Sequence, residues 1–309
     1  MDGVLVIDKP QGLTSHDVVA VARRLLGEAR VGHTGTLDPL ATGVLPLALG
    51  RATRLARFLS ASDKDYEATI RFGLTTDSYD ITGAETGRTD AAPSRDEVLG
   101  ALDSLRGDYL QTPPAYSAKR VEGRRSYDLA RRDEAVALAP APVRVARAEL
   151  LEVAGAQARV AITCSAGFYV RSFAHALGET VGTGACLETL RRTRSGEFGL
   201  DAAVSLEELQ DSRVLASVIP LEELLPGFPA VSVTDHGRAF VSHGRVIGSG
   251  DYISQSGAGL DGPPRGPQGS APRWPGAEWV RIFDSGGALV ALGTKGQAPD
   301  SLHPAVVLI

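Results

Sequence analysis

The sequence predicts a protein of mixed helices and strands that ends in a small β-rich unit. Residues 158–164 alternate apolar and polar side chains with a period of two, which is typical of a half-buried strand. Ser94 and Glu97 have the spacing of a capping box in front of an apolar stripe, which predicts a helix. The Pro/Gly run at 226–229 suggests a domain boundary, because short β patterns follow it at 231–233, 279–283, 288–292 and 306–309.

In the first half of the chain, residues 3–8 are an apolar run that predicts a buried strand before a Lys-Pro-Gln-Gly turn. Thr14 and Asp17 then have the form of a capping box at the start of an amphipathic helix. Residues 32–43 contain too many Gly and Pro residues for a regular element and predict a structured loop. A strand-like run follows, and then a helix from about Arg51.

The second half continues with three strands and two helices. We expect strands at 66–73, 143–153 and 157–164, a helix at 169–181, and a helix capped by Ser205 and Glu208. Residues 112–142 are bounded by Pro-rich segments and look like an excursion from the core. Residues 254–275 are rich in Gly, Pro and Ser and predict a flexible loop.

Composition excludes several classes of protein. The chain has 309 residues with 43% hydrophobic and 22% charged residues, which suffices for a sizeable core. No apolar run reaches the ~20 residues that a membrane span needs, and no secretory signal is visible. Two cysteines cannot form a disulfide framework, and the six histidines show no metal-ligand spacing. We therefore expect a cytoplasmic protein without a metal site.

Charge is unevenly distributed along the chain. The formal net charge is -5, which argues against a wholly basic nucleic-acid-binding protein. Residues 1–60 and 101–200 are nevertheless net positive, whereas 61–100 and 201–309 are net negative. A polyanion site should therefore involve the two positive segments.

The segment Gly32–Gly43 presents one carboxylate, Asp38, within a Gly-rich loop. Pro39 restricts the backbone of Asp38 to extended values, so that its side chain is aimed in one direction. Spacing alone favours an ordinary Asp-Pro turn over a catalytic group. No Gly-Lys-Ser/Thr follows, which excludes a phosphate-binding P-loop.

Three further stretches carry chemically useful side chains. Tyr169 and Arg171 stand two residues apart where a strand leads into a helix, and Tyr66 begins another strand. A packed tyrosine and a solvated arginine are the ordinary alternatives. The excursion is basic, and it could bind a phosphate backbone or form a solvated helix face. Its first basic residues are Lys119, Arg120, Arg124 and Arg125.

Taken together, these stretches resemble the bacterial tRNA pseudouridine-55 synthases, the TruB family, over roughly residues 3–200. The resemblance weakens beyond residue 226. The motifs that carry it, in order, are GVLVIDKPQGLTSHDVV, GHTGTLDPLATGVLPLALGRATR, DKDYEATIRFGLTTDSYD, TPPAYSAKRVEGRRSYDLAR, CSAGFYVRSFAHALGE and GTGACLETLRRTRSGEF.

The resemblance implies an isomerase that converts uridine 55 in the T arm of tRNA to pseudouridine, without a cofactor. It also implies an α+β catalytic domain built on a mixed, mainly antiparallel sheet, followed by a small β-rich PUA-like domain. We place the catalytic domain at residues 1–226, with an RNA-binding flap at 114–142, and the PUA-like domain at 227–309.

Residue by residue, the resemblance makes Asp38 the essential nucleophile or base. Arg171 would keep that carboxylate oriented and charged, because an opposite charge within ~4–6 Å favours the charged form. Tyr66 would stack on the target base and take or relay a proton. His33 would help to hold the flipped-out nucleotide, Tyr169 and Leu190 would line the uridine pocket, and Asp80 could form a hydrogen bond nearby.

Two other functions compete with this hypothesis. A tRNA-folding chaperone could use the same RNA-binding surface without turnover. A glycoside hydrolase would usually need two carboxylates across a sugar, and only Asp38 is obviously presented. We expect a monomer that binds the T stem-loop of tRNA and neither a membrane nor a nucleotide cofactor.

Overall fold

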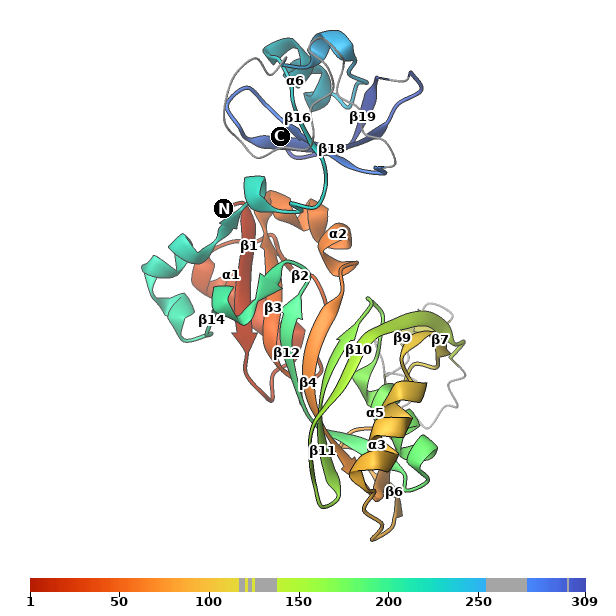
Figure 1. The fold of residues 1–309 in the computed structure, drawn as a ribbon. Coiled ribbons are helices and arrows are strands. Elements are labelled where there is room, and N and C mark those ends of the chain that lie inside the picture. The colour runs from red at the N-terminus through yellow and green to blue at the C-terminus, as the bar shows by residue number, and fades with distance from the viewer. Residues whose placement is uncertain (117–119, 122–123, 126–137, 254–276, 299) are drawn as a thin grey trace.

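A computed structural model describes residues 1–116, 120–121, 124–125, 138–253, 277–298 and 300–309 (Figure 1). In these residues, eleven strands form one large sheet. The strands are β1 (Gly3–Lys9), β2 (Val31–His33), β3 (Thr42–Leu49), β4 (Lys64–Phe72), β7 (Gly107–Gln111), β10 (Ala141–Ala154), β11 (Gln157–Cys164), β12 (Ala185–Ser195), β13 (Phe198–Gly199), β14 (Ala203–Val204) and β15 (Ile219–Pro220).

The main path of the sheet is β14-β1-β3-β12-β4-β11-β10-β7. Strands β1 and β14, and strands β3 and β12, pair in parallel, whereas the remaining pairs of this sheet are antiparallel. The fold class that the resemblance implied, with a mixed and mainly antiparallel sheet, is therefore confirmed. Sequence-distant strands meet at its centre, where β12 lies between β3 and β4.

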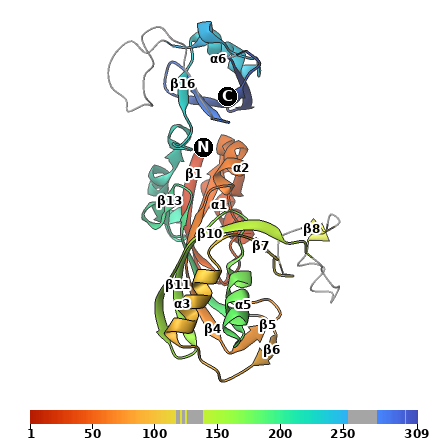
Figure 2. The same cartoon turned by 45° about the vertical axis from the view of Figure 1, so that its right-hand side comes forward.

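Three amphipathic helices pack on the sheet: α1 (Ser15–Leu26), α3 (Arg95–Ser104) and α5 (Val170–Val181). The predicted capping boxes of Thr14 with Asp17 and of Ser94 with Glu97 are both formed. Figure 2 shows α3 and α5 side by side, next to the small hairpin of β5 (Leu74–Thr76) and β6 (Glu85–Arg88). None of the described helices is long and apolar enough to cross a membrane.

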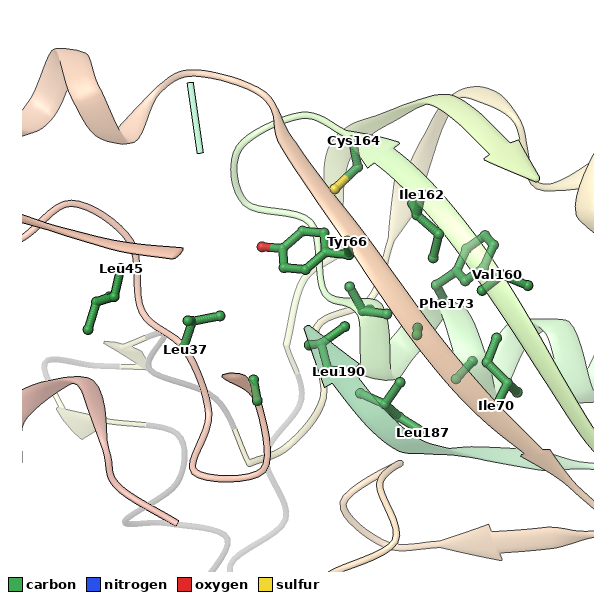
Figure 3. Close-up of a cluster of buried hydrophobic side chains, with 14 of the residues drawn as sticks. Leu37, Leu45, Tyr66, Ile70, Val160, Ile162, Cys164, Phe173, Leu187 and Leu190 are labelled. Atoms are coloured by element: carbon green, nitrogen blue, oxygen red, sulfur yellow. The ribbon is translucent and has the colours of Figure 1, made fainter. Parts of the chain in front are cut away.

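A main hydrophobic core lies between the sheet and these helices. It includes Ile70 of β4, Val160 of β11 and Phe173 of α5, which Figure 3 shows packed together. A second cluster covers the other face of the first strands, with Val4 and Val6 at its centre. The sheet is thus buried on both faces near β1.

The C-terminal end carries a separate four-stranded sheet with the order β16-β17-β18-β19. Its strands are β16 (Ala230–Ser232), β17 (Val280–Phe283), β18 (Leu289–Lys295) and β19 (Leu302–Val307), and the helix α6 (Asp235–Ser242) precedes β17. The second cluster joins this unit to the rest of the chain, since Leu289 and Leu308 belong to it. Both termini lie near this junction in Figure 1.

Several sequence predictions need correction or extension. Ser205 and Glu208 do exchange capping hydrogen bonds, but they start only a 3-10 turn, Glu208–Gln210, instead of a helix. The helix expected from Arg51 begins as a 3-10 segment, Gly50–Leu55, and continues as the short α2 (Ala56–Ser60). The helix α6 was not predicted. Most of the expected flap and the loop at 254–275 lie outside the described residues.

Candidate active site

The loop between β2 and β3 presents Asp38, and hydrogen bonds fix the loop on both sides of this residue. The backbone amide of Leu37 donates to Ser15 Oγ at 2.8 Å, and the same hydroxyl donates to the Leu37 carbonyl at 3.1 Å. The amide of Gly12 donates to the Pro39 carbonyl at 2.8 Å. Asp38 therefore sits on a loop that is tied to the start of α1 and to the turn before it.

Arg171, in the first turn of α5, meets the carboxylate of Asp38. Its Nε lies 2.8 Å from Asp38 Oδ2. The arginine side chain is 5% exposed, whereas the aspartate side chain is 40% exposed. The contact is an ion pair without the alignment of a hydrogen bond at the buried Nε. A buried cation thus orients a carboxylate that solvent and a substrate can still reach.

Backbone carbonyls and a second carboxylate hold the guanidinium of Arg171 in place. Its Nη1 donates to the Ser78 carbonyl at 3.0 Å and its Nη2 donates to the Tyr116 carbonyl at 2.7 Å. Asp80 Oδ2 lies 3.7 Å from Nε. Asp80 is itself fixed by Thr82, whose hydroxyl donates to Oδ1 at 2.6 Å. Two carboxylates therefore lie next to one arginine. Asp38 forms the close ion pair that the resemblance implied, and Asp80 lies farther from the guanidinium.

Arg192 of β12 braces the loop of Asp38 at its two ends. Its Nε donates to the Val44 carbonyl at 2.7 Å and its Nη2 donates to the Gly35 carbonyl at 3.1 Å. The side chain is 1% exposed. Because buried charges need partners, these carbonyls stabilise the cation while the cation closes the loop. Gly43 allows the close approach, since a Cβ there would lie 2.2 Å from the Arg192 carbonyl oxygen.

Tyr66 lies on β4, directly opposite Arg192 in the register of β4 and β12. In Figure 3 its phenol points from β4 toward the side of the loop that carries Leu37, and Leu190 lies beside it. Both Tyr66 and Leu190 are 8% exposed. Burial raises the pKa of Tyr66 above its usual value, and the nearby Arg192 partly opposes that shift. The phenol is therefore neutral at neutral pH and is available as a hydrogen-bond donor.

Two lysines at the ends of strands in the large sheet are buried. Lys9 is wholly buried at the end of β1, and its Nζ donates to the Pro10 carbonyl at 2.9 Å and the Leu13 carbonyl at 2.6 Å. Lys64 is buried two residues before Tyr66. Burial lowers the pKa of each to about 8, and for Lys9 the charge of Asp38 opposes the shift. Lys9 therefore favours negative charge at Asp38.

His33 precedes the loop of Asp38 in the chain, and Tyr169 precedes the helix of Arg171. His33 ends β2, its ring is 5.4 Å from that of His16, and burial lowers its pKa. Tyr169 is the N-cap residue of α5, and its backbone exchanges hydrogen bonds with the side chain of Gln111. Both residues therefore flank the segments that carry Asp38 and Arg171, and their contact with a nucleotide stays a prediction.

The predicted basic residues are only partly visible. Lys119 lies outside the described residues. The backbones of Arg120, Arg124 and Arg125 form the short hairpin of β8 (Arg120–Val121) and β9 (Arg124–Arg125). Their role in binding a phosphate backbone stays a prediction. In the part of the chain that the structure describes, no group of three potential ligands could hold a metal ion.

A cleft of about 300 Å³ lies beside the site and does not include Asp38. Leu40, Thr42 and Leu190 form its end nearest the loop. It is also lined by Glu67 and Thr69, which alternate along β4 with the inward-facing Tyr66. Buried Ala68 and Val160 also line it, so the cleft extends from polar residues of the sheet to the edge of the main core, and Asp38 is not among its lining residues.

Sequence reasoning missed the buried cations. Arg192 stands in the run Arg191-Arg192-Thr193-Arg194, where nothing local marks one arginine as buried. Lys9 ends an apolar strand. A single charged residue at that position is unusual, so it could have indicated a buried cation.

Comparison with known proteins identifies the family. Residues 23–170 match the N-terminal domain of the TruB family pseudouridylate synthases, and residues 171–226 match the C-terminal domain of tRNA pseudouridylate synthase B. A tRNA pseudouridine synthase B of Solibacter usitatus is 44% identical over 313 residues, covering 100% of both chains. The chain belongs to the TruB family of pseudouridine synthases.

Further TruB relatives and solved structures agree with this membership. A tRNA pseudouridine synthase B of Gloeobacter violaceus is 49% identical over 228 residues, which cover 72% of this chain and 77% of that protein. A crystallised complex of Cbf5, Nop10 and Gar1 contains a chain that is 26% identical, with a TM-score of 0.73, covering 99% of this chain and 85% of that one. An H/ACA RNP bound to a substrate RNA gives a TM-score of 0.72 at 25% identity, again covering 99% and 85%.

Proposed function

We propose that this chain isomerises uridine 55 in the T arm of tRNA to pseudouridine at Asp38. The pseudouridylation of tRNA follows from the family and from relatives named tRNA pseudouridine synthase B that match most or all of the chain. The observation that carries the choice of residue is the ion pair of the exposed Asp38 with the buried Arg171 at 2.8 Å. No observation favours the alternative of a chaperone without turnover.

The reaction breaks the N1–C1′ bond of the target nucleotide and forms a C5–C1′ bond within the same residue. The atoms of the nucleotide are conserved, since N1 takes up a proton and C5 gives one up. Asp38 acts as a nucleophile on the sugar or base, or as the base of a glycal route. Arg171 keeps its carboxylate oriented and compensates its charge.

The other residues act on the extruded base. We propose that Tyr66 stacks on the uracil and donates a hydrogen bond from its neutral phenol, because its pKa is raised by burial. Leu190, His33 and Tyr169 line the space around the nucleotide. Extruding a nucleotide costs a few kcal/mol of stacking and pairing, which such contacts offset.

The basic flap supplies further contacts with RNA. We propose that residues 114–142 bind the phosphate backbone through Lys119, Arg120, Arg124 and Arg125. Residues 227–309 form the PUA-like domain beside a catalytic domain at 1–226. We further propose that the protein acts in the cytoplasm and is a monomer. Light scattering of the purified chain tests the monomeric state.

The deciding experiment uses an isolated T stem-loop and the Asp38→Ala variant. Wild-type protein should form pseudouridine without a change in RNA mass, whereas a glycoside hydrolase would release uracil. Asp38→Ala should lose pseudouridine formation while its affinity for the stem-loop stays within about threefold. Turnover by Asp38→Ala at the wild-type rate would refute the role of this carboxylate.

The target position is tested on the RNA. Mapping of pseudouridine in host tRNA with and without the active gene should show a difference at position 55. An anticodon stem-loop is the matched control, and it should stay unmodified. Modification of the anticodon arm instead would refute the T-arm proposal.

A further inference from the structure

The rings of Tyr79 and His175 stack face to face beside the candidate active site. Their centroids are 4.0 Å apart and their planes differ by 5°. His175 lies on α5 one helical turn after Arg171, so that both side chains leave the same face of the helix. Tyr79 lies in the turn between β5 and β6, a hairpin that Figure 2 shows next to α5.

The backbone of Tyr79 adopts a conformation that a residue with a Cβ rarely takes. Its φ is 63°, in the left-handed region, although glycine would be the usual residue there. Its two neighbours in the chain, Ser78 and Asp80, are the residues whose carbonyl and carboxylate contact Arg171. The strained residue is thus the link between two groups that hold the same guanidinium.

Backbone hydrogen bonds tie this turn to the sheet. The distance between the turn and α5 is set by side-chain contacts. The amide of Leu187 on β12 donates to the Tyr79 carbonyl at 2.9 Å, and the amide of Ile81 donates to the Leu187 carbonyl at 2.8 Å. On the helix side, the stack with His175 adds a ring contact to the contacts of Arg171 itself.

We propose that the Tyr79–His175 stack is a positioning device for Arg171, and thereby for Asp38. The stacked rings set the spacing between the turn and α5 at which the Ser78 carbonyl and Asp80 both reach Arg171. This proposal rests on the proposed function and extends it to two residues that have no assigned role at the nucleotide. Shape and contact carry the effect, because no partner for the buried Nδ1 of His175 occurs among the described residues.

Paired variants separate the ring from the backbone. Tyr79→Gly removes the ring and suits the positive φ, so we expect its melting midpoint to stay within about 3 °C of wild type. Its single-turnover rate constant for pseudouridine formation should nevertheless fall about tenfold, because small displacements of catalytic groups are costly. Tyr79→Phe keeps the ring and should retain the wild-type rate constant within about twofold.

The helix side is tested in the same way. His175→Ala should reproduce the tenfold loss, and His175→Phe should restore the rate by restoring a stack. The double variant Tyr79→Gly with His175→Ala should be no slower than either single variant, because both remove the same contact. The affinity for the T stem-loop should stay within about twofold throughout.

Three results would overturn the proposal. Rate constants of Tyr79→Gly and His175→Ala that equal the wild-type value would show that the stack positions nothing. Losses that multiply in the double variant would show that the two rings act separately. A reduced amplitude with an unchanged rate constant would show that the rings serve only folding. If wild-type protein forms no pseudouridine, the proposed function fails first, and the two failures are distinguishable.

Discussion

Arg171 and Asp38 are joined by a contact of 2.8 Å, yet one side chain is 5% exposed and the other is 40% exposed. The asymmetry means that the cation is fixed inside the protein while the carboxylate is presented at the surface. Carbonyls of Ser78 and Tyr116 bind the other nitrogens of the guanidinium, so its position does not depend on Asp38. Such preorganisation lets a catalytic group act without reorganising its surroundings.

Replacing Arg171 by lysine should abolish most activity. Lysine carries a compact charge and cannot reach the separate acceptors that the planar guanidinium spans. We expect a single-turnover rate at least about 100-fold lower. The unfolding free energy in urea should fall by about 2–3 kcal/mol, because buried carbonyls lose their donors.

Arg194→Lys is the matched control for this variant. Arg194 forms an ion pair with Asp65 in which the two side chains are 40% and 30% exposed. Partly exposed pairs contribute little, so we expect less than about 1 kcal/mol and an unchanged rate. Equal effects of the two substitutions would contradict a special role for the buried arginine.

Gly43→Ala should disturb the loop of Asp38 more than an equivalent change elsewhere. Its φ is 97°, and a Cβ there would lie 2.2 Å from the backbone oxygen of Arg192. Gly107 on β7 has a φ of 90° but no atom within 4 Å of such a Cβ, so Gly107→Ala measures backbone strain alone. We expect about 1–2 kcal/mol of destabilisation for Gly107→Ala and at least about 3 kcal/mol for Gly43→Ala.

Activity should separate these two glycine variants as well. Gly43→Ala must displace the segment that Arg192 braces, so pseudouridine formation should fall with stability. Gly107→Ala should keep a rate near that of wild type when it is corrected for folded protein. Similar destabilisation by both substitutions in thermal unfolding would show that the contact with Arg192 is unimportant.

The buried Lys64 should make stability depend on pH between about 8 and 10. In the folded chain burial lowers its pKa from 10.5 to about 8. Between these values the unfolded chain binds more protons than the folded one, so stability rises with pH. Lys64→Met should lower the rise across this interval by about 1 kcal/mol, as measured by urea unfolding at several pH values.

Two points make the lysine experiment selective. Lys295 is exposed at the end of β18, so Lys295→Met should leave the pH dependence unchanged. Lys9 has the same lowered pKa and should keep part of the rise in the Lys64 variant. The raised pKa of Tyr66 acts in the opposite direction, and only above about pH 10. If the unfolding free energy of the wild type did not change with pH over this interval, the lowered pKa of the buried lysines would be refuted.

Trp279→Ala should loosen the junction with the C-terminal unit. The indole packs edge-on against Phe58 with centroids 4.7 Å apart, and the guanidinium of Arg57 lies over both rings. We expect about 2 kcal/mol of destabilisation and faster hydrogen exchange in residues 50–60. Trp279→Phe keeps an aromatic contact and should lose less than half as much. Unchanged exchange in Trp279→Ala would contradict the junction.

Elements whose hydrogen bonds are local could be predicted from the sequence. The capping boxes of Thr14 and Ser94 formed as predicted, because each closes within four residues. The strand at 158–164 followed from its period of two. The box of Ser205 shows the limit of this logic, since its hydrogen bonds form although only a 3-10 turn follows.

Tertiary structure alone decided which charges are buried and which groups meet. Arg191 and Arg192 are adjacent in the chain, yet the side chain of Arg191 is 40% exposed and Arg192 is 1% exposed. Alternation along β12 turns Arg191 outward and Arg192 inward. A register shift between Arg192 and Arg194 turns Arg194 outward as well. Which face is buried depends on strands and helices from distant parts of the chain, so only the assembled sheet could bring Arg192 beneath the loop of Asp38.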